Sequence, residues 1–336
     1  MKDHSVKLTI LKTLSQGGFH SGQELGESLG ISRAAISKHI KGIQSWGVDI
    51  FSVQGKGYQL SQPMQLLDEA MLKSKVKTSL ELVPIIDSTN QYLLDRVEQL
   101  ESGSACIAEY QAKGRGRRGR EWVSPFGSNL YLSIYWRLDA GMAAAMGLSL
   151  VVGVAIVEAL EKLGIDGVKL KWPNDLYFED KKLAGILVEM SGQAGAAANL
   201  VIGMGINLNM ATDNQGTSQS VTENITQPWV SLSQVCDSLP NQHLAKIDRN
   251  ELAATLINTL HHTLEDYEMR GMNGFVERWN RLDNFIGRKV KLIMGSREIE
   301  GISQGIDAQG AVLLETEQGI ESFIGGEISL RSNEVQ

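Results

Sequence analysis

The sequence of 336 residues predicts a multidomain α+β protein with an amino-terminal winged helix-turn-helix, a central α/β domain and a small carboxy-terminal β-barrel. Three observations lead to this prediction. A basic region with three helix patterns and a hairpin comes first, a long region of alternating helix and strand patterns follows, and the tail consists of short strand-like runs separated by glycines. One hydrophobic core rarely organises a chain of this length, so we place the domain boundaries at 1–63, 64–270 and 271–336.

Three helix patterns define the first domain. Apolar residues recur at helical spacing before a double glycine, and Ser21 then precedes Glu24 by the three residues of a capping box. After a glycine turn, Ser32 opens a third helix whose isoleucines share one face. Two short helices joined by a tight turn predict a helix-turn-helix between Gly22 and Lys41, with the recognition helix last.

A hairpin completes the winged helix. Residues 48–53 alternate in strand fashion, a turn with two glycines places Lys56 at its tip, and the strand pattern resumes at 58–60. Residues 1–60 carry seven Lys and Arg against four Asp and Glu, whereas the rest of the chain carries 25 against 35. A basic module on an acidic body indicates that this module binds DNA, with a protein–protein adapter as the alternative. The candidate DNA contacts are Ser32, Arg33, Ser37, Lys38 and Lys56.

Strand patterns separated by helix patterns continue through the central region and the tail. In the central region they cover 105–110, 129–136, 168–172, 184–190 and 200–208. In the tail they cover 289–294, 298–306, 311–315 and 320–324, which predicts the β-barrel. Residues 211–228 are rich in Asn, Ser, Thr, Gln and Gly without a periodic pattern, so we expect a surface loop there.

Composition and cysteine usage indicate a cytoplasmic protein. Cys106 and Cys236 lie far apart without a CxxC pair, so neither a disulfide framework nor a structural zinc site is expected. The first 14 residues mix charged and apolar side chains and lack the apolar core of a signal peptide. Residues 140–157 carry no charge, but alanine and glycine dominate them, which favours a buried helix over a membrane span.

Residues 114–120, with the sequence GRGRRGR, place four guanidinium groups on a glycine-rich backbone. Glycine permits close approach to a ligand and guanidinium groups match phosphate oxygens, so we expect a loop that closes over phosphate. The run also matches the GxGxxG pattern of dinucleotide-binding folds, but the residues that follow it break a helix. A solvated basic loop or an RNA-binding segment is the alternative.

Four further motifs lie at predicted helix starts and at the ends of predicted strands. Residues 87–90, with the sequence DSTN, precede a helix pattern, KWPND at 171–175 ends a strand, and KLAGILVE at 182–189 begins another. GMGIN at 203–207 ends an apolar strand, where bare backbone would let a flat ring lie on the sheet. Taken singly, these motifs are explained by a helix cap, a hairpin and a glycine bulge.

In this order the motifs resemble those of the biotin protein ligases, specifically the bifunctional biotin ligase and biotin-operon repressor. The resemblance covers essentially the whole chain and includes Gln111 upstream of the GRGRRGR loop. It implies that the central domain contains a mixed sheet like that of class II synthetases and that the barrel is SH3-like.

The resemblance implies an ATP-dependent ligase that joins biotin and ATP into biotinyl-5′-adenylate and releases pyrophosphate. Biotin would then pass to a lysine of biotin carboxyl carrier protein, a subunit of acetyl-CoA carboxylase. The adenylate-bound homodimer would bind operator DNA and repress genes of biotin biosynthesis. Magnesium is expected to arrive with the ATP phosphates, because the sequence shows no carboxylate cluster that would hold a metal.

Residue roles follow from the same resemblance. The implied biotin-binding residues are Ser88, Thr89, Asn90, Gln111, Arg115, Gly116, Arg117 and Lys182. The implied ATP- and adenylate-binding residues are Arg117, Arg118, Trp122, Asn174, Lys182 and Asn207. Lys182 and Arg117 would offset the repulsion between a carboxylate and the α-phosphate, which is about 4 kcal/mol at 4 Å for an effective dielectric constant near 20. Asp175 would help the acceptor lysine to lose its proton.

Two other functions are kept as alternatives. A lipoate or octanoate ligase shares the catalytic fold, but the winged helix and the KWPND motif argue against it. A ligand-sensing repressor without catalysis would not need Lys182 and the arginine loop. One departure from the family pattern is Met204, whose bulk between two glycines would alter the fit of adenine.

Overall fold

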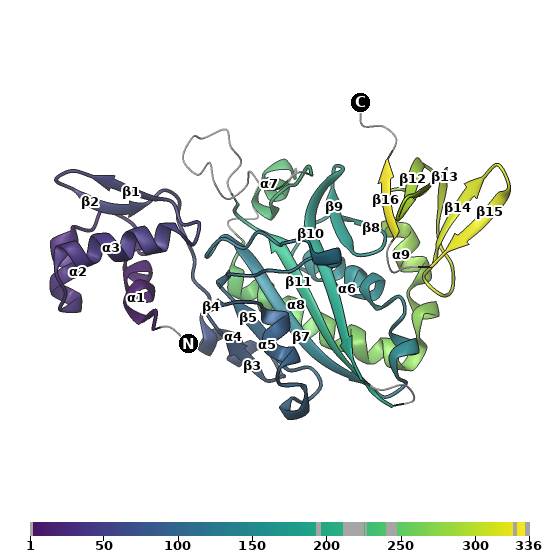
Figure 1. The fold of residues 1–336 in the computed structure, drawn as a ribbon, viewed down its shortest axis with the longest axis horizontal. Coiled ribbons are helices and arrows are strands. Elements are labelled where there is room, and N and C mark those ends of the chain that lie inside the picture. The colour runs from purple at the N-terminus through teal and green to yellow at the C-terminus, as the bar shows by residue number, and fades with distance from the viewer. Residues whose placement is uncertain are drawn as a thin grey trace.

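The structure, a computed structural model, describes residues 3–192, 196–210, 225, 227–239, 247–324 and 328–332. It contains an amino-terminal helical domain, a central sheet flanked by helices and a carboxy-terminal sheet, arranged in this order along the molecule (Figure 1). The multidomain α+β class is confirmed. Most of the surface loop expected at 211–228, namely 211–224 and 226, lies outside the described residues.

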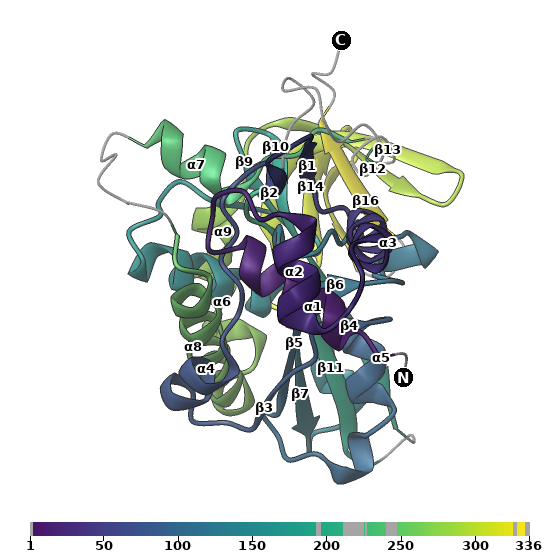
Figure 2. The same ribbon diagram turned by 90° about the vertical axis from the view of Figure 1, so that its left-hand side faces the viewer.

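The amino-terminal domain is a winged helix, seen from its own end in Figure 2. Its elements are α1 (Ser5–Leu14), α2 (Gly22–Leu29), α3 (Arg33–Gln44), β1 (Ile50–Val53) and β2 (Gly57–Leu60). The predicted capping box is present, because Ser21 and Glu24 exchange side-chain-to-backbone hydrogen bonds of 3.1 Å. Gly30 ends α2 in the left-handed conformation at φ 67°, which glycine adopts without steric cost.

Trp46, just beyond α3, joins the winged helix to the central domain. Its indole stacks on the Phe126 ring at a centroid distance of 5.8 Å and lies 5.9 Å from the Tyr110 ring. The Phe126 amide also donates to the Trp46 carbonyl at 2.9 Å. Phe126 is buried in the same apolar cluster as the isoleucines of the winged helix, so the two domains share a core.

A seven-stranded mixed sheet forms the central domain, with the strand order β3-β5-β7-β11-β10-β9-β8. β3 and β5 pair in parallel, and the other neighbours pair antiparallel. The strands are β3 (Leu80–Leu82), β5 (Ala105–Ala108), β7 (Asn129–Leu138), β8 (Lys169–Lys171), β9 (Asp175–Phe178), β10 (Lys181–Ser191) and β11 (Ala198–Asn207). A separate parallel pair joins β4 (Ile85–Ile86) to β6 (Tyr110–Gln111).

Each strand pattern predicted for the central region corresponds to a strand, and the pattern at 105–110 divides into β5 and β6. The prediction lacks β3, β4 and β9. These strands contain two to four residues, which is too short for a periodic pattern to be recognised.

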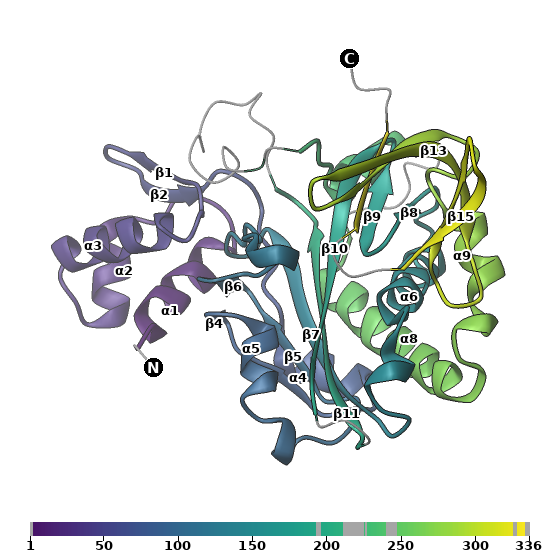
Figure 3. The same cartoon turned by 45° about the vertical axis from the view of Figure 1, so that its right-hand side comes forward.

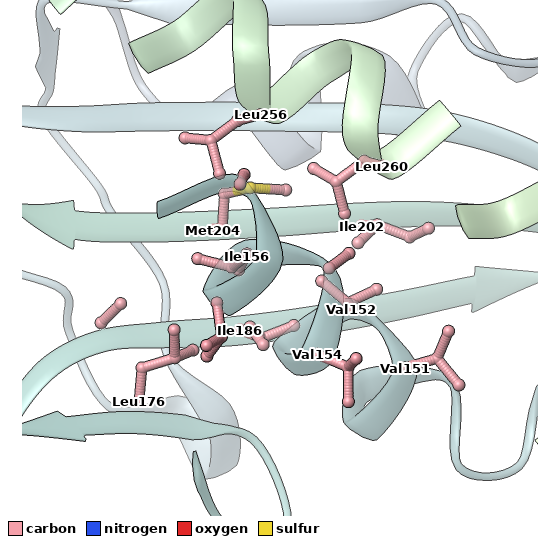
Figure 4. Packing of buried hydrophobic residues seen from close by; sticks show 14 of the residues in the cluster. Val151, Val152, Val154, Ile156, Leu176, Ile186, Ile202, Met204, Leu256 and Leu260 are labelled. Carbon is pink, nitrogen blue, oxygen red and sulfur yellow. The ribbon is translucent and has the colours of Figure 1, made fainter. Parts of the chain in front are cut away.

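Helices cover both faces of the central sheet (Figure 3). α6 (Leu148–Lys162) and α8 (Arg249–Arg270) pack on one face, and α5 (Thr89–Leu94) packs on the other. In Figure 4, apolar side chains of α6, α8, β10 and β11 fill the space between helices and sheet. The described residues of this region also form the α-helices α4 (Glu69–Lys75), α7 (Leu232–Ser238) and α9 (Val276–Leu282).

The uncharged run at 140–157 belongs to this core. Its second half begins α6, which is buried along most of its length, and its first half forms a short 3-10 turn over Met142–Ala145. In the described part of the chain, no helix has both the length and the hydropathy needed to cross a membrane.

A buried ion pair anchors the segment that links the winged helix to the central domain. Arg249, at the start of α8, pairs with Glu109 at 2.8 Å, and both side chains are almost fully buried. The other oxygen of Glu109 accepts from the Leu67 amide at 2.6 Å, and Arg249 donates to the Gln65 carbonyl. Removing either charge would leave its partner buried and uncompensated.

A five-stranded antiparallel sheet forms the carboxy-terminal domain, with the order β15-β14-β13-β12-β16. Its strands are β12 (Lys289–Met294), β13 (Arg297–Ile306), β14 (Val312–Thr316), β15 (Gly319–Phe323) and β16 (Ile328–Ser332). The four predicted runs match β12 to β15 within one residue at each end, and β16 was not predicted. Trp172 donates from Nε1 to the Gly310 carbonyl at 3.0 Å, which ties the KWPND motif to this sheet.

Asp283, between α9 and β12, is a buried carboxyl group with a pH-dependent effect on stability. Its side chain is 6% exposed, Oδ1 accepts from the Phe285 amide at 2.9 Å, and burial raises its pKa from 3.8 to about 6. This difference corresponds to a penalty of about 3 kcal/mol for the ionised form. The folded protein holds this proton more tightly than the unfolded chain, so this group lowers the free energy of unfolding as pH rises from about 4 to 6.

We expect Asp283→Asn to raise the free energy of unfolding by ~1–3 kcal/mol at pH 7.5 and by less than about 1 kcal/mol near pH 4. Urea unfolding of both proteins at the two pH values measures this difference. Asp139→Asn, at an exposed carboxylate, serves as the control. An equal effect of Asp283→Asn at both pH values would contradict the raised pKa.

Candidate active site

A cavity brings together motifs that are far apart in the sequence. Its wall comprises the start of α5, the loop at 115–122, the turn at 171–175 and the facing stretches of β10 and β11. The predicted residues that line it are Ser88, Thr89, Asn90, Gln111, Arg115, Gly116, Arg117, Arg118, Trp122, Asn174, Asp175 and Lys182.

Neutral hydrogen-bonding groups form one part of the wall. Gln111 accepts from the Thr89 amide at 2.9 Å and donates from Nε2 to Ser124 Oγ at 3.2 Å. Ser88 is the N-cap of α5, and the buried Ser133 hydroxyl lies 2.7 Å from Thr89 Oγ1. Because these partners fix each side chain, this part of the cavity is preorganised for a polar, uncharged group.

Asn90 and Arg115 meet at a carboxylate that the sequence analysis did not select. Glu189 Oε2 accepts from Asn90 Nδ2 at 2.8 Å and from Arg115 Nη2 at 2.9 Å. Asn90 Oδ1 lies 2.6 Å from the Ser133 hydroxyl, and Arg115 Nη1 donates to Gln91 Oε1 at 2.9 Å. The Arg115 guanidinium is therefore held by protein acceptors.

Charged groups form the other part of the wall. Lys182 Nζ pairs with Asp175 Oδ1 at 2.9 Å, and both side chains are mostly buried. Arg117 donates to Asn174 Oδ1 at 3.0 Å. Burial lowers the pKa of Arg117, Asp175 opposes this effect, and Arg118 and Arg120 add to it. An arginine remains charged despite such a shift, so two cations can stabilise negative charge here.

The bare backbone expected at the GMGIN motif is covered by a ring of the protein itself. A Cβ built on Gly205 would lie 2.3 Å from the Trp122 indole, and one built on Gly185 would lie 3.0 Å from it. The Lys182 ammonium lies 5.5 Å from the centroid of this ring. Trp122 Nε1 is buried without a hydrogen-bond partner among the described residues.

Two residues lie differently from what the sequence suggested. The Met204 side chain packs among the core residues between sheet and helices, as labelled in Figure 4, because side chains alternate along β11. Its bulk therefore points away from the face that carries Gly203 and Gly205. Asn207 is buried and does not line the cavity; its Nδ2 donates to the carbonyls of Lys182 and Val230.

The segment at 114–120, which we call the glycine–arginine loop, is folded on itself as a small hairpin. The Gly116 amide donates to the Arg120 carbonyl at 2.7 Å, and the Trp122 amide donates to the Gly114 carbonyl at 2.9 Å. Arg118 has a left-handed backbone at φ 59° and is exposed, as is Arg120.

The candidate DNA contacts lie on the winged helix. Ser32 caps the recognition helix α3, accepting from the Ala35 amide at 3.2 Å. Arg33, Lys38 and Lys56 are exposed, and Ser37 is half-buried. Lys56 lies at the predicted tip of the wing, 5.6 Å from the Phe19 ring.

No group of three or more His, Cys, Asp or Glu side chains within the described ranges is arranged to hold a metal ion. Asp175 is the carboxylate among the predicted site residues, and it pairs with Lys182.

Three family models match successive parts of the chain. An HTH domain matches residues 6–59, the biotin/lipoate A/B protein ligase family matches 82–207, and the biotin protein ligase C-terminal domain matches 285–331. This fold and this cavity thus define a protein ligase with a helix-turn-helix domain.

Relatives match the chain over nearly its whole length. The bifunctional ligase/repressor BirA of Salmonella typhimurium is 55% identical over 99% of this chain and 100% of its own, and that of Escherichia coli is 54% identical over the same shares. The chain belongs to this family of bifunctional biotin ligases and repressors. Among solved structures, the biotin protein ligase from Aquifex aeolicus in complex with biotin and ATP is similar, with a TM-score of 0.64 and 30% identity, covering 76% of this chain and 99% of that chain.

The close packing of Trp122 on Gly205 gives a testable prediction. A Cβ at residue 205 cannot coexist with the ring as it lies, so Gly205→Ala should displace Trp122 and destabilise the protein by ~1–3 kcal/mol. Tryptophan fluorescence, with Trp122→Phe used to assign the signal, and urea unfolding measure the two effects. In the control Gly42→Ala, the new methyl meets the flexible end of Lys7. An unchanged Trp122 signal in Gly205→Ala would contradict the packing.

Proposed function

We propose that the protein is a biotin–[biotin carboxyl carrier protein] ligase that also acts as a transcriptional repressor. One cavity combines the Lys182–Asp175 pair and Arg117 with fixed neutral hydrogen-bonding groups. This combination is the main support for the proposed ligase activity. Whole-length similarity to bifunctional ligase/repressors supports both halves. Similarity to a ligase bound to biotin and ATP supports those two substrates.

Biotin combines an uncharged ureido ring with an apolar tail that ends in a carboxylate. An uncharged polar ring needs a few fixed donors and acceptors, which the preorganised part of the cavity supplies. We therefore assign biotin binding to Ser88, Thr89, Asn90, Gln111, Arg115, Gly116, Arg117 and Lys182.

In the proposed first step, an oxygen of the biotin carboxylate attacks the α-phosphorus of ATP. A carboxyl–phosphate bond forms, the bond between the α- and β-phosphates breaks, and pyrophosphate leaves with the electron pair. Negative charge builds up at the α-phosphate, and Lys182 and Arg117 would stabilise it. In the structure Lys182 pairs with Asp175, so the ligand oxygens would compete with Asp175 for the ammonium.

We assign ATP and adenylate binding to Arg117, Arg118, Trp122, Asn174, Lys182 and Asn207. Asn174 supports this assignment because it accepts from Arg117 and donates to the Ile186 carbonyl, which fixes Arg117 against β10. The flat Trp122 ring suits stacking on adenine. The contacts of Asn207 favour an indirect role, because this side chain holds the main chain of Lys182.

In the proposed second step, the ε-amine of a carrier-protein lysine attacks the biotinyl carbonyl, an amide bond forms and AMP leaves. A lysine with an ordinary pKa of about 10.4 is protonated at neutral pH and must lose a proton first. Asp175 is our candidate acceptor for this proton, since it lines the cavity and becomes available once Lys182 turns to the adenylate. We further propose that Mg²⁺ enters with the ATP phosphates.

The winged helix supports the repressor half of the proposal. Two copies of the adenylate-bound protein would present two α3 helices to a palindromic operator, as dimeric helix-turn-helix proteins do. We propose the same three-part division, at 1–63, 64–270 and 271–336, for the DNA-binding, catalytic and carboxy-terminal domains. The free cysteines Cys106 and Cys236 are both buried, and they are compatible with the cytoplasmic location that we propose.

Biotin-dependent exchange of pyrophosphate into ATP tests the enzymatic half. We expect exchange with biotin and not with lipoate, and a fall of about 10²–10³-fold in Lys182→Ala, because the cation acts where charge develops. Lys181→Ala, at the exposed neighbouring lysine, is the matched control and should exchange like the original protein. Exchange with lipoate alone would favour the lipoate ligase alternative, and exchange with neither acid would favour a repressor without catalysis.

Binding to DNA from promoters of biotin biosynthesis genes tests the repressor half. Phosphate contacts release counterions, so Arg33→Ala with Lys38→Ala should weaken binding and reduce the slope of log affinity against log salt by about 2. Fluorescence anisotropy at several salt concentrations, with biotin and ATP present, measures this slope. Lys73→Ala, at an exposed lysine of α4, is the control. An unchanged slope in the double variant would show that another surface binds the DNA.

A further inference from the structure

Glu189 of β10 is a partly exposed carboxylate without a role in the proposed reaction. Its Oε2 accepts from Asn90 Nδ2 at 2.8 Å and from Arg115 Nη2 at 2.9 Å. Asn90 belongs to α5, and Arg115 belongs to the glycine–arginine loop. One oxygen atom therefore connects three segments of the cavity wall.

The loop residue in this contact is held on two sides. Arg115 Nη1 donates to Gln91 Oε1 of α5 at 2.9 Å, while Nη2 donates to Glu189. A guanidinium presents its donors in a rigid planar fork, so two fixed acceptors define its orientation. The main chain of Arg115 also forms an antiparallel bridge with Glu121. Fixing the side chain therefore restrains the hairpin that carries Gly116 and Arg117.

The strand that presents Glu189 is paired with β11 along this stretch. Glu189 pairs with Val201 in a regular antiparallel register, whereas β9 pairs with β10 only at 181–185. On the opposite side, Asn90 is fixed by the Ser133 hydroxyl at 2.6 Å and by the Leu187 carbonyl at 3.2 Å. The loop is thus the segment whose position depends most on the contact with Glu189.

We propose that Glu189 is a positioning residue that holds the glycine–arginine loop closed over the biotin part of the cavity through Arg115. This inference rests on the proposed biotin ligase function. It assigns the Arg115 side chain to loop closure, and it leaves Arg117 and Lys182 as the cations that meet phosphate. The carboxylate also cancels the charge of Arg115 near the site of the uncharged ureido ring.

Loop closure has a defined kinetic consequence. If biotin binds well only to the closed loop, its apparent dissociation constant is the intrinsic one divided by the closed fraction. Weakening the Arg115–Glu189 pair lowers this fraction and leaves Lys182 and Arg117 in place. The KM for biotin should then rise by a larger factor than the maximal exchange rate falls.

The first test measures pyrophosphate exchange against biotin concentration at saturating ATP. Glu189→Gln keeps an oxygen acceptor for Asn90 and removes the charge, and we expect the KM for biotin to rise about tenfold. Glu158→Gln is the matched control. The Glu158–Arg278 ion pair is 2.8 Å long, and its side chains are 26% and 33% exposed. The Glu189–Arg115 ion pair is 2.9 Å long, and its side chains are 27% and 36% exposed, so the two pairs are closely matched. The KM of this control should stay within twofold of the original protein.

Combining substitutions separates a specific pair from general damage. Arg115→Gln should raise the KM for biotin about as much as Glu189→Gln, and the double variant should be no worse than Arg115→Gln alone, because the pair is already broken. If the KM of the double variant instead rises by the product of the two single-variant factors, the proposal is overturned. Arg115→Lys, on the loop, should also raise the KM, since an ammonium cannot match the two-acceptor geometry.

A second readout needs no ligand. Trypsin cleaves after arginine, so a loop that opens more often should be cut faster between residues 115 and 120. We expect cleavage of Glu189→Gln to be several-fold faster than that of the original protein or Glu158→Gln. A KM within twofold together with unchanged cleavage would overturn the proposal. If the original protein shows no biotin-dependent exchange, the proposed function fails, and the cleavage rates still decide whether Glu189 holds the loop.

Discussion

The antiparallel pairing of β10 with β11 is the constraint on which the rest of the structure depends. Eight consecutive residue pairs, from Ala184–Ile206 to Ser191–Asn199, fix the register of these strands. On one face, Ile186, Ile202 and Met204 complete the core under α6 and α8 (Figure 4). On the other, glycines leave room for Asn90 and Trp122. A shift by one residue would exchange the two faces and remove both the core and the cavity.

Two ion pairs are built into the cavity wall. Glu189 pairs with Arg115, and Asp175 pairs with Lys182. These carboxylates limit the cost of placing several cations in one wall. An anionic ligand that approaches Lys182 would have to replace Asp175. The affinity for phosphate therefore depends on the difference between the Lys182–phosphate and Lys182–Asp175 interactions.

Motifs with a strong local pattern could be predicted from the sequence, and contacts between distant segments could not. The capping box at Ser21 and the strands β12 to β15 depend on neighbouring residues, which periodicity and turn chemistry reveal. The roles of Glu189 and Ser133 depend on which segments lie side by side in space. The sequence showed glycines at 203 and 205, but it could not show that Trp122 would lie over them or that Met204 would face the helices.

The shared core around Trp46 has a consequence for dividing this protein. Tyr110 precedes Gln111 on β6, and Phe126 ends the segment that follows the loop, so both partners of Trp46 belong to the part of the chain that builds the cavity. A fragment that begins after residue 63 would expose these two rings to water and lose the carbonyl that accepts from the Phe126 amide. Dividing the chain at this point would therefore expose apolar surface beside the cavity, because Trp46 packs on residues that adjoin Gln111 and Ser124.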